Sequence, residues 1–171
     1  MKEAEKHHVL PIDDRLLERG LAEKVGHPDL MAGRTSLTLA KGMTGMLENV
    51  FLNVKNESKT LTAEIEVPAG GAHGTIIAQG GRFGGWSLYV KDGVPGLRLQ
   101  LSRPAARLGR RHHKLAPGKA TLRFEFAYDG GGLGKGGQGT LYVNDKKVAE
   151  GRIAHTQPII FSGRRDRRRG H

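Results

Sequence analysis

Residues 120–128 read ATLRFEFAY, and this stretch decides the fold class. Leu122, Phe124 and Phe126 lie on one side of an extended chain, and the charged residues between them lie on the other. Such alternation is typical of a strand with one buried and one solvated face, as in an antiparallel sheet. The stretch therefore predicts a mainly β protein with antiparallel pairing.

Other stretches support the same interpretation. KTLTAEIEV, TSLTLA and WSLYV also alternate, whereas GTIIAQG resembles a more fully buried strand; these are residues 59–67, 35–40, 86–90 and 74–80. Tight turns are predicted at Pro68 to Gly71, at Asp92-Gly93, and at Asn144-Asp145 between TLYV and KKVAEG. We predict an all-β chain whose residues 34–162 form an antiparallel two-sheet β-sandwich.

The composition is compatible with one such domain. The chain has 171 residues, 26 of them glycine, with 37% hydrophobic and 5% aromatic residues. The glycines suit many short strands joined by turns, and the core is expected to consist mainly of Val, Leu and Ile. No cysteine is present, which excludes disulfides, thiolate metal sites and a cysteine nucleophile.

The first residues differ from the rest. Residues 1–33 are rich in helix formers, so a helical leader or linker is expected there. Asp13 is suited to cap the helix, and Gly26 and Pro28 to end it. The adjacent Asp13 and Asp14 are therefore interpreted as a helix start rather than as a cation site.

No stretch of the sequence approaches a membrane span of eighteen apolar residues. The N-terminal stretch MKEAEKHHVLPIDD is too acidic and polar for a signal peptide. By default, a cytoplasmic location is expected.

The positive charge is concentrated in two segments. The net charge is +11, and residues 95–117 hold six Lys or Arg and no acid. Residues 163–171 hold five Arg and one Asp, and we expect them to form a basic, disordered tail. Nucleic-acid binding is the weakest function class, because no aromatic residues alternate with these arginines to stack on bases.

The glycine-rich stretch DGGGLGKGGQGT, residues 129–140, superficially resembles a phosphate-binding loop. That loop requires a Ser or Thr after its lysine and a helix after the loop. Here Gly136 follows Lys135, and the strand-like TLYV comes next. A flexible hairpin connection is predicted, and no nucleotide site is assigned.

Several residue groups could suggest a site. The adjacent pairs His7-His8 and His112-His113 have the wrong spacing for chelation, because neighbouring side chains diverge. Arg82, Phe83 and Trp86 lie among glycines, which suits either packing against another strand or an aromatic platform for a sugar ring. Packing is the favoured interpretation, since the chain has a single Trp.

The chain resembles the C-terminal, post-catalytic region of large bacterial arylsulfatases over Lys2 to Val94 and Lys119 to Ser162. The resemblance rests on four stretches: HHVLPIDDR, DLMAGRTSLTLAKGMTGMLENVFLNVKNES, IIAQGGRFGGWSLYVKDG and FEFAYDGGGLGKGGQGTLYVNDKKVAEGRIAHTQPIIFS. It implies a concanavalin-like jelly roll that follows, and packs against, a sulfatase catalytic domain.

The resemblance also implies what the chain lacks. Family members use a formylglycine from a Cys/Ser-x-Pro-x-Arg motif beside Ca²⁺ or Mg²⁺. The nearest candidate runs from Ser102 to Arg107, but its arginine comes one position late, in a segment without resemblance. We therefore assign no catalytic, cofactor-binding or metal-ligating residue and expect no enzymatic activity of this chain alone. The remaining alternatives are a carbohydrate-binding module and, more weakly, a nucleic-acid binder.

The basic segments coincide with departures from the family. Where the family continues with a pattern resembling Tyr-x-Tyr-Asn-Phe, this chain has LRLQLS at residues 97–102. Codons CTA CGA CTA CAA CTT TC, read one base later, encode Tyr-Asp-Tyr-Asn-Phe. Our hypothesis is that residues 95–117 and 163–171 are frameshift products, so that an authentic central strand and the last strand are missing.

Overall fold

The structure is a computed structural model. It forms two compact units, residues 1–53 and 54–171, and the strands found among the described residues belong to the second. Apart from Lys6 and Gly33, the predicted leader over residues 1–33 lies outside the described residues, as does the tail 163–171. The described residues are 6, 33–40, 42–43, 45–46, 51–81, 84–100, 106–108, 113–159 and 161.

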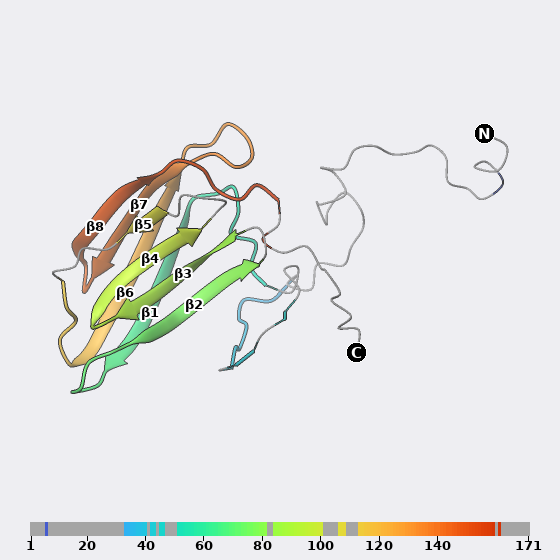
Figure 1. Ribbon diagram of the computed structural model, residues 1–171. Helices are drawn as coiled ribbons and strands as arrows, with labels where there is room; N and C mark the ends of the chain where they lie inside the picture. The colour runs from blue at the N-terminus through green and yellow to red at the C-terminus, as the bar shows by residue number, and fades with distance from the viewer. Residues whose placement is uncertain are drawn as a thin grey trace, which may run out of the picture. The chain divides into compact units, whose positions relative to one another are not determined.

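The second unit is a two-layer β structure (Figure 1). One sheet has the order β1-β6-β7-β8 and the other β2-β3-β4-β5, and all neighbouring strands pair antiparallel. The predicted antiparallel two-sheet arrangement is confirmed. The strands are β1 (Lys59–Val67), β2 (Gly74–Gly81), β3 (Gly84–Lys91), β4 (Val94–Gln100), β5 (Ala106–Leu108), β6 (Gly118–Tyr128), β7 (Gly137–Val143) and β8 (Lys146–Ile153).

The predicted turns are confirmed. The Gly71 amide donates to the Pro68 carbonyl at 2.9 Å. Asp92 and Gly93 join β3 to β4 with φ of 54° and 78°. Asn144 and Asp145 join β7 to β8, also with positive φ. Positive φ at both central residues is the type I′ geometry that matches the twist of paired strands.

Two strand predictions need correction. Residues 35–40 form no strand, and Leu39 is 42% exposed, because alternation supplies an amphipathic face but no hydrogen-bonding neighbour. Residues 74–80 do form β2, but they are half-buried or exposed rather than fully buried. The reason is that β2 is the outermost strand of its sheet.

The first basic segment contributes to the sheet. Residues 94–100 form β4, paired with β3 on one side and β5 on the other, and Leu97 and Leu99 are buried. A central strand is therefore present at this position. The frameshift origin of the segment remains a hypothesis, since Leu-Arg-Leu alternates just as Tyr-Asp-Tyr would.

The core lies between the two sheets. Leu88 from one sheet and Leu122 and Leu141 from the other have no exposed surface. The core is richer in aromatic residues than the composition suggests. The single Trp and three of the five Phe residues are buried there, namely Trp86, Phe124, Phe126 and Phe161.

The two sheets pack closely where a leucine of one sheet lies against a pair of glycines in the other. Gly139 and Gly151 lie opposite each other on β7 and β8. A Cβ added to Gly139 would lie 2.5 Å from Cδ1 of Leu108, and one added to Gly151 would lie 2.7 Å from its Cδ2. The missing side chains leave a depression in the sheet that Leu108 of β5 fills, so these strand glycines serve packing rather than turning.

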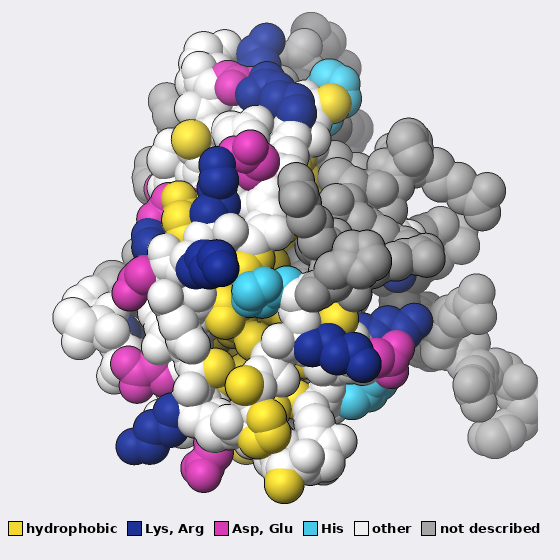
Figure 2. Space-filling model, turned by 90° about the vertical axis from the view of Figure 1, so that its left-hand side faces the viewer, with side chains coloured by type: hydrophobic (Ala, Val, Ile, Leu, Met, Phe, Trp, Pro, Cys, Tyr) yellow, Lys and Arg dark blue, Asp and Glu magenta, His cyan; other side chains and the backbone are white. Residues whose placement is uncertain are grey.

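The surface carries both signs of charge. On the face shown in Figure 2, Lys and Arg side chains are interspersed with Asp and Glu, around a band of hydrophobic side chains. Within the part of the chain described here, no helix is both long and apolar enough to cross a membrane.

Candidate functional site

The glycine-rich stretch is a connection between β6 and β7, which pair antiparallel; the predicted hairpin is confirmed. Its backbone is held by side chains. The Tyr128 hydroxyl donates to the Gly132 carbonyl at 2.6 Å and accepts from the Lys135 amide at 2.9 Å. The Thr156 hydroxyl donates to the Lys135 carbonyl at 2.8 Å. The loop amides and carbonyls therefore serve to fix the loop against its own domain.

Asn56 joins three separate segments at the same end of the sandwich. Its Nδ2 donates to the Pro158 carbonyl at 2.7 Å, and its Oδ1 accepts from the Gly134 amide at 2.8 Å. Its backbone has φ of 58°, a conformation in which Asn is enriched. The side chain thus ties the entry to β1 to the glycine-rich loop and to the segment after β8.

Replacing Asn56 by glycine is expected to lower the free energy of unfolding by about 2 kcal/mol, or about 1 kcal/mol for each lost hydrogen bond. Glycine keeps the positive φ, so the change removes the side-chain contacts without adding backbone strain. Urea unfolding of the two proteins measures the effect. A loss of unfolding free energy below about 0.5 kcal/mol, the size typical of a surface substitution, would contradict the proposed bridging role of the Asn56 side chain.

Asp129 and Arg152 form a bidentate ion pair at the start of the loop. Nη1 of Arg152 donates to Oδ1 of Asp129 at 2.7 Å, and Nη2 donates to Oδ2. The Arg152 guanidinium lowers the pKa of Asp129, and the carboxylate raises the pKa of Arg152. Both groups are solvent-exposed, so the pair orients the loop more than it stabilises the fold.

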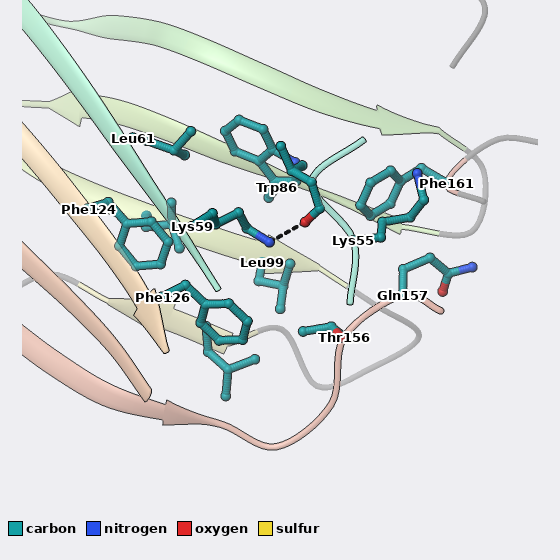
Figure 3. Close-up of a pocket in the computed structure, with 13 residues that line it drawn as sticks. Lys55, Lys59, Leu61, Trp86, Leu99, Phe124, Phe126, Thr156, Gln157 and Phe161 are labelled. Carbon is teal, nitrogen blue, oxygen red and sulfur yellow. Dashed lines mark hydrogen bonds between the residues drawn. The ribbon is translucent and has the colours of Figure 1, made fainter. Parts of the chain in front are cut away.

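A pocket opens between the two sheets, near the segments that Asn56 joins (Figure 3). Its cavity has a volume of about 30 Å³, which is space for roughly two water molecules. Side chains from both sheets and from the segments before β1 and after β8 form its walls. They are Val54, Lys55, Lys59, Leu61, Trp86, Leu97, Leu99, Phe124, Phe126, Ile153, Thr156, Gln157 and Phe161.

Lys59 is the polar group inside this apolar space. Its Nζ donates to the Val54 carbonyl and lies 5.0 Å from the centroid of the Phe126 ring. Burial lowers the pKa of Lys59, and the nearby charge of Lys55 lowers it further, while the charge of Glu57 opposes the change. The amine thus sits in surroundings that disfavour its charged form.

The remaining polar groups lie toward the segment after β8. Nζ of Lys55 is 5.4 Å from the centroid of the buried Phe161 ring, a cation–π arrangement. The Thr156 amide donates to the Gly134 carbonyl at 3.2 Å, which holds the segment after β8 against the loop. One wall of the pocket therefore depends on the same contacts that fix the glycine-rich loop.

Trp86 is a packing residue. Its side chain is 7% exposed, and Nε1 donates to Oε1 of Gln79 on the neighbouring strand at 3.1 Å. The prediction that Trp86 packs in the core is confirmed, and a buried ring leaves no open face for stacking on a sugar. Arg82 and Phe83 lie outside the described residues.

The other candidates from the sequence are not brought together. His7, His8, Asp13, Asp14, Ser102 and His112 lie outside the described residues, and His113 is half-buried. Among the residues that are described, no group of three His, Cys, Asp or Glu side chains could hold a metal ion. Arg98 of the first basic segment lies on β4 and donates to Gln100 at 2.9 Å.

The sequence analysis missed Lys59, although a signal was present. In the alternating stretch 59–67, Lys59 is in phase with Leu61, Ile65 and Val67, whose side chains face the core. A lysine at an inward position of a strand is unusual and points to a polar group placed inside. What the pattern could not give was the set of aromatic rings that surrounds this amine.

Comparison of this chain with family models, with curated proteins and with solved structures gave no match.

Proposed function

We propose that this chain is a non-catalytic accessory β-sandwich of the concanavalin-like, jelly-roll type, related to the C-terminal region of bacterial arylsulfatases. The proposal rests on the sequence resemblance. Its support from the fold is that two of the four resembling stretches cover strands that are neighbours in a sheet. IIAQGGRFGGWSLYVKDG begins within β2 and covers β3 and the following turn, and the longest stretch covers the last five residues of β6, all of β7 and β8, and the pocket wall after them.

The role in this proposal is structural support of a separate catalytic domain. The sulfatase reaction implied by the resemblance needs a formylglycine and a metal, and the sequence offers no motif in the required spacing for the former. The chain would then pack against a sulfatase domain encoded separately or lost. Neither sulfate-ester hydrolysis nor specific nucleic-acid binding is part of the proposed role.

The gene and its neighbourhood provide the first test. We expect an upstream reading frame that encodes a sulfatase domain with a formylglycine motif, and codons at residues 97–102 that encode Tyr-Asp-Tyr-Asn-Phe when read one base later. Different codons in a clean read would remove the frameshift hypothesis and leave the accessory role standing. A gene without any sulfatase frame nearby would count against the accessory role.

The purified chain provides the second test. We expect no release of nitrophenol from nitrophenyl sulfate, and we expect the chain to co-purify with the upstream sulfatase domain when the two are co-expressed. Hydrolysis proportional to the concentration of this chain, with contaminating hydrolases excluded, would overturn the proposal.

A further inference from the structure

Among the described residues that line the pocket between the sheets, the charged side chains are lysines. Two of its lining side chains are lysines, Lys55 and Lys59, and the other described lining residues are neutral. Four of those neutral residues are aromatic, namely Trp86, Phe124, Phe126 and Phe161, so the half-buried Lys59 lies in largely apolar surroundings (Figure 3). Glu57 is close enough to favour the charged amine, but it does not line the pocket.

Within the described part of the chain, Lys59 has more N–H donors than hydrogen-bond acceptors. An ammonium group has three N–H donors. One points to the Val54 carbonyl, and the Phe126 ring lies at 5.0 Å from the nitrogen. A buried charge is normally matched by an opposite charge, because desolvation is otherwise uncompensated. None of the described lining residues is a carboxylate, and the nearby Glu57 lies outside the lining.

We propose that this pocket is a binding site for a single small anion, a carboxylate group above all, held by the Lys59 ammonium with Lys55 beside it. The anion accepts hydrogen bonds from Lys59 Nζ, and charge-assisted bonds of this type are the stronger class. The aromatic walls raise the strength of the ion pair by lowering the local dielectric constant. This inference is independent of the proposed relationship to arylsulfatases.

The size of the cavity limits the ligand. A volume of about 30 Å³ accepts roughly two water molecules or an ion of similar size. A benzene molecule, in contrast, occupies an engineered cavity of about 150 Å³. The ligand is therefore formate, a comparable ion, or the carboxylate end of a longer molecule whose body stays outside.

Binding should depend on pH in a defined direction. The anion binds the protonated amine, so affinity is full at low pH and falls as pH rises through the pKa of Lys59. Burial and Lys55 place that pKa below the ordinary lysine value, and Glu57 opposes them. A bound anion stabilises the charged form and should raise the pKa of Lys59 by linkage.

The single Trp gives a local reporter, since Trp86 lines the pocket. Iodide is the probe, because it is an anion that quenches tryptophan on contact. At constant ionic strength we expect saturable quenching of Trp86 by iodide, reversed by added formate. Caesium, a cationic quencher, should have little effect on this buried ring. Linear, unsaturated quenching that formate does not reverse would overturn the proposal.

Variants locate the site. Lys59→Met should weaken iodide binding about tenfold or more, the scale of a hydrogen bond to a charged group, whereas Lys59→Arg should retain part of it. Lys119→Met is the matched control, because Lys119 is exposed on β6 and should leave binding unchanged. If iodide quenched Lys59→Met as strongly as the wild type, and both proteins unfolded at the same urea concentration, the assignment of Lys59 as the anion-binding group would be contradicted.

Two further probes separate the possible sources of the carboxylate. Acetate and butyrate are compared with formate as competitors of iodide. Equal or weaker competition by the longer acids identifies a site for a free small ion. Stronger competition with increasing length identifies the carboxylate end of a larger ligand, with its body along the pocket mouth. Failure of all three acids to compete would refute a carboxylate site.

Discussion

Replacing Leu141 by alanine is expected to lower the free energy of unfolding by about 4 kcal/mol. Leu141 lies on β7, between β6 and β8, and its side chain has no exposed surface. The loss combines the transfer free energy of the removed methyl groups with the cost of the cavity that remains. Because Leu122 and Leu88 fill the same interior, neighbouring side chains have little freedom to close the gap.

Leu133→Ala is the matched control for this change. Leu133 lies in the glycine-rich loop, and its side chain is 51% exposed. The same chemical truncation should change the free energy of unfolding by less than about 0.5 kcal/mol. Urea unfolding, with equal slopes for all three proteins, measures both effects. Similar losses in the two variants would mean that β7 is not the centre of the core.

Gly137→Ala is expected to be nearly as harmful, with a loss of about 3 kcal/mol from overpacking. Gly137 begins β7, where a Cβ would lie 2.3 Å from the Ala127 carbonyl oxygen and 2.5 Å from the Phe126 ring. The carbonyl belongs to the neighbouring strand β6, so relief requires a shift of the sheet backbone. The added methyl group also presses on a ring that lines the anion pocket.

Gly70→Ala separates this steric effect from the general cost of replacing glycine. Gly70 is exposed in the turn after β1, and a Cβ there would meet no atom within 4 Å. This change should be neutral or slightly stabilising, since alanine reduces the entropy of the unfolded chain. The two alanine variants are compared by thermal unfolding. A midpoint for Gly137→Ala equal to that of Gly70→Ala would show that the close approach is absent in solution.

The sequence by itself determined several of the strands and the tight turns of this protein. Alternation in residues 59–67 and 120–128 reports which side chains share a face, and both stretches form strands. Asp92-Gly93 and Asn144-Asp145 form the hairpin turns, since their residue types tolerate positive φ. These are local properties, set by neighbouring residues along the chain. The prediction for residues 35–40 was wrong because a strand also needs a partner, which local pattern does not provide.

Only the tertiary structure decided which faces and segments meet. β1 pairs with β6, although four other strands lie between them along the chain. Asn56 donates a hydrogen bond to the carbonyl of Pro158, which is 102 residues later in the sequence. The same folding brings Phe161, the last residue described, to the pocket that holds Lys59. Alternation could place that lysine on the inner face, but its lowered pKa and the aromatic ring beside it arise from groups that only packing assembles. The alternation of side chains along a strand shows which face of the sheet each one occupies. The chemistry of a site depends instead on distances between residues of different strands.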